Sequence, residues 1–382
     1  MTSYQSYLYQ ISTAAILSIY SLTTLAAPDQ TLVNLGNALY NDTQLSNNGT
    51  QSCATCHNPK HGFIDNRDNG VKGAGSLGDD GHSIGDRNAP TAAYASLSPA
   101  FHFDTKSQKY KGGQFHDGRE TDLKGQAGGP PTNPIEMGMK DKAALVKKLQ
   151  NNPFYVQSFT SLFGKDIFSD VDQAYLAMTK SIAAFESTTE FAPFDSKYDR
   201  YLKGEYTLTD HEELGRSLFF SNNNTNCATC HQLKASEDQT GETFTNYEYH
   251  NIGTPKNTAL RSKNGKSSTH IDHGLLENPA ITDQQHDGKF KVPTLRNIAV
   301  TGPYMHNGVF QELSTVLAFY DKFNNKKRHL NPENKQPWNA AEVPATVNKK
   351  DLKAKKLTDA KMAALEAFLR TLTDKRFEHL LK

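Results

Sequence analysis

The sequence predicts an all-α fold of two helical domains that are related by an internal duplication and carry long loops. Apolar residues recur at helical spacing, while strand signals are sparse. The five-residue segment Cys-Ala-Thr-Cys-His occurs twice, once in each half of the chain. A length of 382 residues also suits two domains of ordinary size. We expect these domains to span residues 28–200 and 201–382, with a boundary near 195–206.

The two copies of the segment match Cys-x-x-Cys-His, the sequence to which haem c is attached. Two thiols three positions apart add to the two vinyl groups of one porphyrin, and the adjacent histidine becomes an iron ligand. The alternatives are a disulfide or a zinc site, but a zinc site would normally combine both pairs into one cage. We therefore predict two covalent haem c groups. Their expected attachment residues are Cys53, Cys56 and His57, and Cys227, Cys230 and His231.

The first residues of the chain resemble a secretory signal peptide. An apolar run over residues 14–22 is followed by Leu25-Ala26-Ala27-Pro28, a small-residue cleavage site, so residues 1–27 are expected to be removed. The leader lacks Lys and Arg, which leaves an uncleaved anchor as the alternative, although the run is short for a membrane span. Export agrees with covalent haem attachment. We expect a periplasmic protein with no membrane span in the mature chain.

The helices are expected in the same order in each half. Residues 31–40 have helical spacing, and Thr209 with Glu212 forms a capping box that opens a second such helix. Each leads through a polar loop into Cys-Ala-Thr-Cys-His. Each half then ends in an amphipathic helix whose apolar stripe is expected to be core. The two stripes are Val171, Tyr175, Met178, Ile182 and Phe185, and Met362, Leu365, Phe368, Leu369 and Leu372.

Further segments recur between the halves. Residues 87–91 (Arg-Asn-Ala-Pro-Thr) are echoed by residues 292–297, and Phe-His-Asp-Gly at 115–118 is echoed by Met-His-Asn-Gly at 305–308. Long polar loops are expected at residues 65–86, 234–291 and 326–356, a length that is unusual unless the loop is functional. The net charge of +1 gives no case for nucleic acid or an anionic membrane, so any protein-docking surface would be local.

With these motifs in order, the chain resembles the bacterial di-haem cytochrome c peroxidase family, which includes the MauG group. The resemblance covers nearly all of the mature chain. It rests on both Cys-x-x-Cys-His segments together with Arg-Asn-Ala-Pro-Thr, Phe-x-Asp-Gly-Arg, Pro-x-Asn-Pro-x-Glu-Met, Pro-Thr-Leu-Arg-Asn and Pro-Tyr-Met-His-x-Gly. It implies two cytochrome c-like domains, H₂O₂ as a substrate and a calcium ion between the haems. Asn88, Thr301 and Pro303 match the calcium positions, although Asn88 could merely cap a turn.

The resemblance places a peroxide-binding pocket over the haem on His57. Glu136 is similar to the family's distal acid or base, and Gln126 and Pro130 fall on pocket positions. A carboxylate over a haem would be desolvated, and its raised pKa would suit proton transfer near neutral pH. The alternative for Glu136 is a surface carboxylate near a helix start. We expect the iron of this haem to have an open position, with His82 a better sixth ligand than His61 if one exists.

The second haem, on His231, is expected to be the site of electron entry. Conventional members of the family supply a Met ligand where this chain has Tyr320, and Tyr at this place resembles the MauG group. A phenolate favours ferric iron, whereas a thioether favours ferrous iron. Tyr320 could instead be a core aromatic. Met305 is a competing ligand, and His306 fits a haem-propionate contact. His116 stands where the family usually has an inter-haem Trp, and the single Trp338 lies in a loop.

Three functions are compatible with this sequence. The first is a periplasmic peroxidase that reduces H₂O₂ with electrons from a small cytochrome c or cupredoxin. The second is a MauG-like enzyme that uses peroxide to oxidise a protein side chain, which Tyr320 motivates. The third is a di-haem electron carrier with both irons closed. We rank them in this order. A homodimer is compatible with any of the three.

Overall fold

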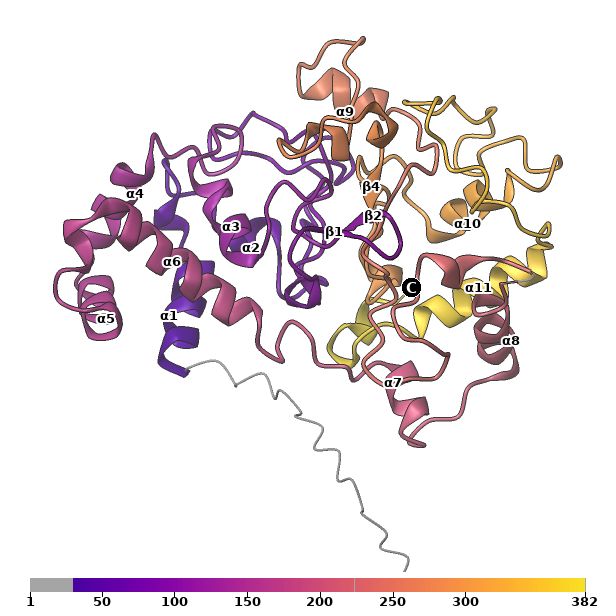
Figure 1. Cartoon of the computed structure of the whole chain (residues 1–382), viewed down its shortest axis with the longest axis horizontal. Helices are drawn as coiled ribbons and strands as arrows, with labels where there is room; N and C mark the ends of the chain where they lie inside the picture. Colours follow the sequence, from indigo (N-terminus) through magenta and orange to yellow (C-terminus); the bar gives the residue numbers. More distant parts are fainter. Residues whose placement is uncertain (1–29, 223, 382) are drawn as a thin grey trace, which may run out of the picture.

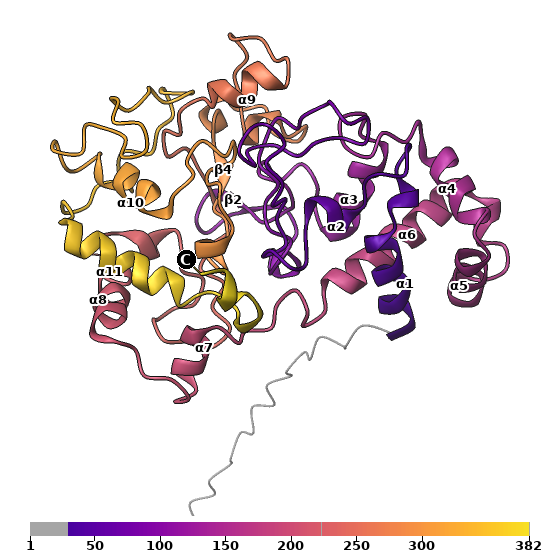
Figure 2. The same cartoon turned by 180° about the vertical axis from the view of Figure 1, so that it is seen from behind.

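The computed structural model describes residues 30–222 and 224–381. The predicted signal peptide, residues 1–27, lies outside this part of the chain. The helices of the first half are α1 Gln30–Asn41, α2 Cys53–Cys56, α3 Leu123–Gly128, α4 Lys142–Gln150, α5 Pro153–Phe163 and α6 Val171–Glu186. Those that follow are α7 Lys197–Leu202, α8 Asp210–Phe219, α9 Thr258–Lys263, α10 Leu313–Asp321 and α11 Asp359–Arg370. Figures 1 and 2 show α1 to α6 in one lobe and α8, α10 and α11 in the other.

Each lobe is built on one pair of crossed helices, α1 with α6 and α8 with α11. A glycine permits each close approach. A Cβ added to Gly36 would lie 1.9 Å from the carbonyl oxygen of Ser181, and one added to Gly215 would lie 1.9 Å from that of Ala364. No side chain fits at such a distance, so glycine is required at both crossings. Thr209 caps α8 with Glu212 as predicted, since Thr209 Oγ1 accepts from the Glu212 backbone N–H.

Two hydrophobic cores follow from these helix pairs. The first is drawn mainly from residues 33–191 and the second from residues 198–372. All the predicted stripe residues of α6 except Val171 are buried in the first core; Val171 is 38% exposed at the start of the helix. The C-terminal 3₁₀ helix Lys375–Leu380 returns from the second half to the first, so Phe377 packs into the first core. The chain is thus helix-rich with two cores.

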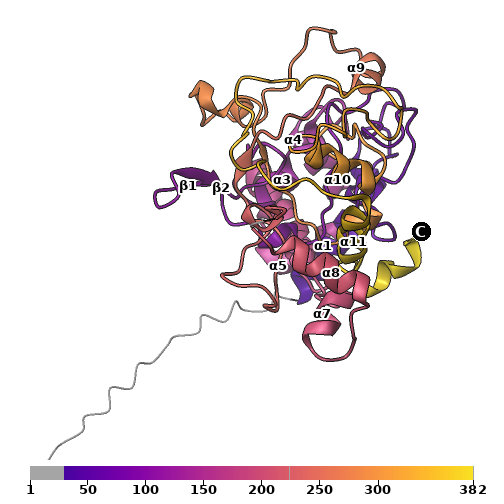
Figure 3. The ribbon, with the colours of Figure 1, turned by 90° about the vertical axis from the view of Figure 1, so that its right-hand side faces the viewer.

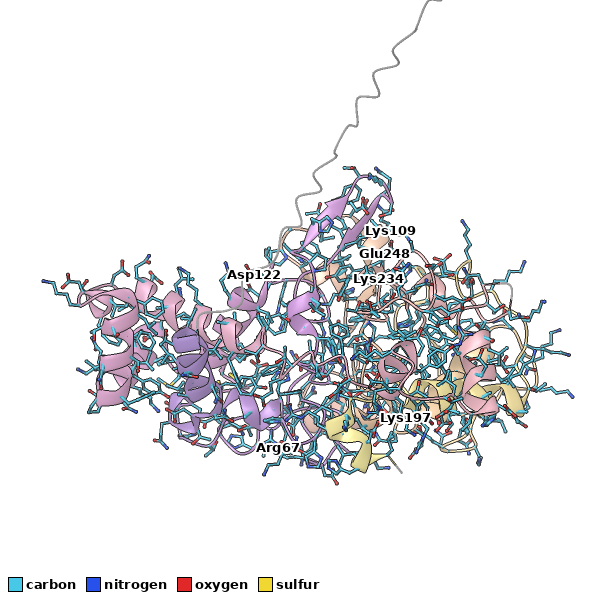
Figure 4. The ribbon with its side chains drawn as sticks, turned by 90° about the horizontal axis from the view of Figure 1, so that it is seen from below. Arg67, Lys109, Asp122, Lys197, Lys234 and Glu248 are labelled. Atoms are coloured by element: carbon cyan, nitrogen blue, oxygen red, sulfur yellow. The ribbon has the colours of Figure 1, made fainter. Side chains whose placement is uncertain are left out.

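Two short antiparallel strand pairs lie outside the helices, and the all-α prediction did not include them. Strand β1 His102–Asp104 pairs with β2 Lys109–Lys111, and β3 Tyr249–His250 pairs with β4 Phe290–Lys291. The β1–β2 hairpin stands out from the body of the molecule in Figure 3. It reaches the second half through an ion pair of 2.7 Å between Lys109 and Glu248, which lie close together in Figure 4.

Matching turns of the two halves meet at one buried carboxylate. Tyr94 and Asn297 occupy left-handed backbone positions at φ 60° and 62°. The Tyr94 hydroxyl donates to Asp374 Oδ1 at 2.6 Å, and Asn297 Nδ2 donates to Asp374 Oδ2 at 2.8 Å. Burial raises the pKa of Asp374 to about 6. The halves are therefore joined by a polar contact that excludes water as well as by apolar packing.

Candidate haem sites

The first Cys-x-x-Cys-His segment begins on α2 and ends at His57. His57 Nδ1 donates to the carbonyl oxygen of Phe63 at 3.3 Å, and the Tyr40 hydroxyl donates to the carbonyl oxygen of His57 at 2.8 Å. Burial also lowers the pKa of His57, so the ring is neutral. With the proton on Nδ1, Nε2 is the nitrogen that can ligate a metal.

The second segment repeats this arrangement with different residues. His231 Nδ1 donates to the carbonyl oxygen of Phe244 at 3.1 Å, and burial lowers the pKa of His231 to about 4. Phe63 and Phe244 share left-handed backbone conformations at φ 56° and 55°. Each half therefore presents one neutral imidazole, oriented by a backbone carbonyl of its own loop.

The thiols beside these histidines fit haem attachment better than the alternatives. All four cysteines are free, so the disulfide interpretation is wrong. Among the described residues, no group of three or more His, Cys, Asp or Glu side chains could hold a metal ion, which excludes a zinc cage there. Burial raises the pKa of Cys56 to about 11 and that of Cys230 to about 12. Burial therefore keeps these thiols neutral when neither a metal nor a haem is bound.

Two buried side chains at the interface between the halves have nitrogen atoms without a hydrogen-bond partner among the described residues. His306 Nε2 and both terminal nitrogens of Arg261 are buried without a hydrogen-bond partner among the described residues. The nearest carboxylates are 4.0 Å away for His306, at Asp272, and 3.7 Å away for Arg261, at Glu342. Buried donors of this kind normally find an acceptor. They fit the carboxylate groups of a haem, which is the propionate role predicted for His306. Arg261 was missed by the sequence analysis because it belongs to no motif.

Glu136 lies close to the first haem-attachment segment. Burial raises its pKa, opposed by the nearby Arg119 guanidinium and by a hydrogen bond from Asn133. Its charge in turn acts on the Cys56 thiol. Glu136 is therefore a half-buried, desolvated carboxyl group near Cys56 and not an exposed surface carboxylate.

The other predicted pocket residues come from the segment around Pro130. Gln126 and Pro130 are half-buried on α3 and on the 3₁₀ helix Pro130–Thr132. The Pro130 carbonyl accepts from the Met137 N–H at 3.2 Å, which folds the segment back on itself. Arg119 lies 3.6 Å from the centroid of the Phe115 ring, measured from its guanidinium carbon. Arg119 was part of the quoted Phe-x-Asp-Gly-Arg motif, but the sequence alone suggested no role for it.

The two histidines considered as sixth ligands of the first iron lie in surface turns. The His82 side chain is 82% exposed and lies 3.3 Å from Asp80 Oδ2. This position does not agree with His82 as the better candidate, because a ligand would have to be buried against the haem. His61 is half-buried in the turn that precedes Phe63. An open position on the first iron is therefore the simplest expectation.

Tyr320 lies beside the second haem-attachment segment. It is on α10, and its pKa is raised by burial and, secondarily, by the nearby thiols of Cys230 and Cys227. Its ring contacts Phe319 edge-on at 6.1 Å between centroids. Met305, the competing ligand, packs against the second core. The structure thus brings Tyr320 to the second site, whereas the sequence could not separate a ligand from a core aromatic.

His116 and His306 lie on the interface between the halves. His116 Nε2 donates to the carbonyl oxygen of Asn88 at 2.9 Å, and burial lowers the pKa of His116 to about 4. The His306 ring stacks on Phe290 at 3.5 Å between centroids. Trp338 packs instead against Phe310 at 5.7 Å, within the second half. His116 is accordingly neutral and half-buried at this interface, whereas Trp338 lies within the second half.

Two of the three predicted calcium positions meet at Gly73. Asn88 Nδ2 donates to the Gly73 carbonyl oxygen at 3.1 Å, and a Cβ added to Gly73 would lie 3.2 Å from Pro303 Cδ. Thr301 packs on Gly62, on the same side of the interface. Carbonyl and amide oxygens of this kind are ligands that Ca²⁺ accepts.

Comparison with known proteins agrees with these sites. The sequence profile of the di-haem cytochrome c peroxidases matches residues 30–207. Methylamine utilization protein MauG from Paracoccus denitrificans (strain Pd 1222) is 49% identical over 93% of this chain and 91% of its own length. The chain belongs to the di-haem cytochrome c peroxidase family. Cytochrome c peroxidase Ccp of Escherichia coli (strain K12) is 33% identical over 73% of this chain and 50% of its own length.

Solved structures extend the family relationship to the fold. Diheme peroxidase BthA from Burkholderia thailandensis is 30% identical, with a TM-score of 0.82 over 93% of this chain and 89% of that chain. A Tyr-to-Met variant of BthA matches equally well. A MauG-like protein associated with microbial copper homeostasis is 26% identical, with a TM-score of 0.66. As a member of the di-haem peroxidase family, the protein is a peroxidase-type oxidoreductase with two haem groups.

Replacing Tyr320 tests its assignment within this peroxidase. Tyr320→Met should raise the reduction potential of the second haem by at least about 0.1 V, within the ~0.8 V that axial ligands span, because a thioether favours ferrous iron. Tyr320→Phe should give a new high-spin ferric signal. Redox titration and EPR of the haem-loaded variants measure both. Unchanged spectra and potentials in both variants would show that Tyr320 is only a core aromatic.

Proposed function

We propose that this protein reduces H₂O₂ to water, using two electrons that enter through the haem held by His231. The observation that carries the proposal is the chemical difference between two similar haem sites. A desolvated carboxyl group, Glu136, lies by the first segment, and a tyrosine, Tyr320, lies by the second. A carboxyl group can move protons for peroxide chemistry, whereas a tyrosine that binds the second iron would keep peroxide away from it.

The chain's own residues account for the proton transfers. When bound, haem supplies an iron with an open position and a route for electrons. The Glu136 carboxylate accepts a proton from one oxygen of H₂O₂ and returns it to the other oxygen as the O–O bond breaks. Two electrons from the donor and two protons from solvent complete the conversion of H₂O₂ to two water molecules. Arg119 opposes the rise in the pKa of Glu136 that burial causes and so favours its carboxylate form.

The test is peroxide turnover by the fully haem-loaded protein with a reduced small cytochrome c. We expect the cytochrome to be oxidised in a 2:1 ratio to H₂O₂, because each donor gives one electron. A high-spin ferric signal in the resting protein should accompany this activity. Turnover at the uncatalysed rate, with only low-spin iron, would identify an electron carrier instead.

A second candidate function is peroxide-dependent oxidation of a protein side chain, as the name of the MauG relative suggests. Tyr320 and the 49% identity to MauG favour it. The two functions differ in the source of electrons. In the first a small redox protein supplies them, and in the second the protein substrate does. A modified partner side chain, found by mass spectrometry after incubation with peroxide and without a cytochrome, would support this function over the first.

The domain organisation, a calcium ion and the cellular location belong to the same proposal. The predicted domains, residues 28–200 and 201–382, arose by duplication of one haem c domain, which the matching turns and helix crossings support. A calcium ion lies near Asn88, Thr301 and Pro303. The protein acts in the periplasm after removal of residues 1–27. No helix of the described residues is long and apolar enough to cross a membrane.

A lysine-rich segment over the second haem site favours an acidic electron donor. Residues 349–356 contain five exposed lysines, and none of them forms an ion pair within the described residues. The segment is anchored on the loop that precedes Cys227, since the Asp351 carbonyl accepts from Asn226 Nδ2 at 2.9 Å. The Lys355 N–H also donates to the Asn224 carbonyl at 2.8 Å. The five lysines are Lys349, Lys350, Lys353, Lys355 and Lys356.

Reversing two of these charges should slow oxidation of an acidic cytochrome. We expect Lys353→Glu with Lys356→Glu to lower kcat/KM for the cytochrome roughly tenfold at low salt, the lower end of steering effects. The loss should shrink as ionic strength rises, because salt screens exposed charges. The control is Lys165→Glu with Lys180→Glu, two exposed lysines of the first half. Equal losses in both double variants would argue against this surface.

A further inference from the structure

The two helix crossings allow residues of the two halves to be matched one by one. A Cβ added to Gly36 would meet Ser181 and Phe185, and one added to Gly215 would meet Ala364 and Phe368. The distances agree, at 2.9 Å to the Phe185 Cβ and 2.8 Å to the Phe368 Cβ. Phe185 of the first half is therefore the counterpart of Phe368 in the second.

This match shows chemical differences between otherwise similar cores. The residue after Phe185 is Glu186, whereas the residue after Phe368 is Leu369. One helical turn beyond the glycines, the first half has Tyr40 and the second has Phe219. Tyr40 packs on Phe185 at 5.4 Å between ring centroids, and Phe219 packs on Phe368 at 5.2 Å. The first half thus carries a polar pair where the second half is apolar.

Glu186 has no structural partner that explains its burial. The residue is 4% exposed, and its Oε2 has no hydrogen-bond partner among the described residues. Burying a carboxyl group without a partner is costly, and Leu369 shows that a leucine fits the equivalent position. Packing alone therefore does not account for the acid.

The surroundings of Glu186 connect it to the first haem site. Among the described residues, the elements packed on α6 bring two titratable groups into its electrostatic reach, Tyr40 from α1 and the Cys53 thiol from α2. Glu190, beyond the end of α6, acts on Tyr40. Tyr40 in turn donates its hydroxyl to the carbonyl oxygen of His57 at 2.8 Å. With haem attached, Cys53 would become a thioether, and Glu186 would then lie near both Tyr40 and the haem bound through Cys53.

We propose that Glu186 is the proton-binding site of the first haem, taking up one proton when that haem gains one electron. Glu186 balances the charge of the added electron by binding a proton, and it does not touch peroxide. In the second half, Leu369 occupies the position equivalent to Glu186 and cannot bind a proton. The inference requires only that the first haem be attached and holds for any of the substrates considered above.

The electrostatics give the direction of the coupling. Burial raises the pKa of Glu186 to about 8 in the absence of any opposing charge. Ferric iron adds a positive charge nearby, which favours the carboxylate and lowers this pKa. Reduction of Fe(III) to Fe(II) by one external electron removes that charge, and the carboxylate then binds one proton from solvent to become the neutral acid. A proton supply is useful here because peroxide reduction consumes two protons with its two electrons.

The experiment is an EPR-monitored redox titration of the haem-loaded full chain between pH 5 and 9. The potential of the first haem should fall with pH at up to about 59 mV per unit, the value for one proton per electron. In Glu186→Gln and Glu186→Leu this slope should flatten, while the slope of the second haem should not change. The control is Glu205→Gln, a change at an exposed carboxylate, which should keep the slope. An undiminished slope in both Glu186 variants, or a slope lost only in Glu136→Gln, would overturn the proposal.

A measurement on the unmodified sequence keeps the test independent of how the variants fold. Infrared difference spectra between reduced and oxidised protein should show a protonated carboxyl band appearing on reduction. Labelling with ¹³C-glutamate should shift that band, which separates it from Asp and haem carboxyl groups. A spectrum without a glutamate-dependent band across pH 6–8 would overturn the proposal, whatever the peroxidase activity.

Discussion

Glu136→Gln should lower peroxide turnover of the haem-loaded enzyme by about 100- to 10,000-fold, the usual contribution of a general acid or base. Gln keeps the size and hydrogen-bonding capacity of the side chain but cannot accept a proton from peroxide. The loss should appear in kcat and kcat/KM together, because the proton moves in the transition state. Stopped-flow kinetics with H₂O₂ and a reduced cytochrome measure it.

The pH dependence of the same variant provides the control. Burial raises the pKa of Glu136, so the activity of the unmodified enzyme should fall as pH drops through that pKa, because the protonated acid can no longer accept a proton. In Glu136→Gln, the remaining activity should no longer fall as the pH drops through this range. Glu205→Gln, a change at an exposed carboxylate, should keep both the turnover rate and its fall at acid pH. Normal turnover in Glu136→Gln would place the proton transfer elsewhere.

Arg296→Met should destabilise the protein by about 3–5 kcal/mol, the cost of leaving one buried charge without its partner. The Arg296 side chain is fully buried and binds both oxygens of Asp199, at 2.5 and 3.0 Å. It also donates to the Glu242 carbonyl oxygen, from Nε at 2.8 Å and from Nη2 at 2.6 Å. Without the guanidinium, the Asp199 carboxylate stays desolvated. Urea unfolding curves of the haem-loaded protein measure the change.

Removing the second charge should restore most of that stability. The double change Arg296→Met with Asp199→Leu replaces a buried ion pair with apolar side chains, which is often close to neutral. The difference in unfolding free energy between the single and double variants measures the cost of the unpaired Asp199 carboxylate. If both variants lost the same stability, the contacts of Arg296 with Tyr94, Phe194 and Phe244 would be the larger contribution.

Much of the site was predictable because its chemistry depends on residues close together in the chain. The haem-attachment segments are recognised from a spacing that matches two vinyl groups, and the structure orients His57 and His231 in the same way. The capping box at Thr209 is equally local. The family resemblance rests on the same kind of short motif, and it correctly indicated a di-haem peroxidase.

What depends on distant segments could not be predicted in this way. Exposure of His82, the approach of Tyr320 to Cys227 and Cys230, and the strand pairs each require knowledge of where remote loops lie. Glu186 is the clearest case, because nothing near it in the sequence distinguishes a surface acid from a buried one. Covalent spacing and helix capping act over a few residues, so the sequence alone determined them. Desolvation is the sum of contacts from the whole fold, and only the tertiary structure decided which acids are buried beside a haem.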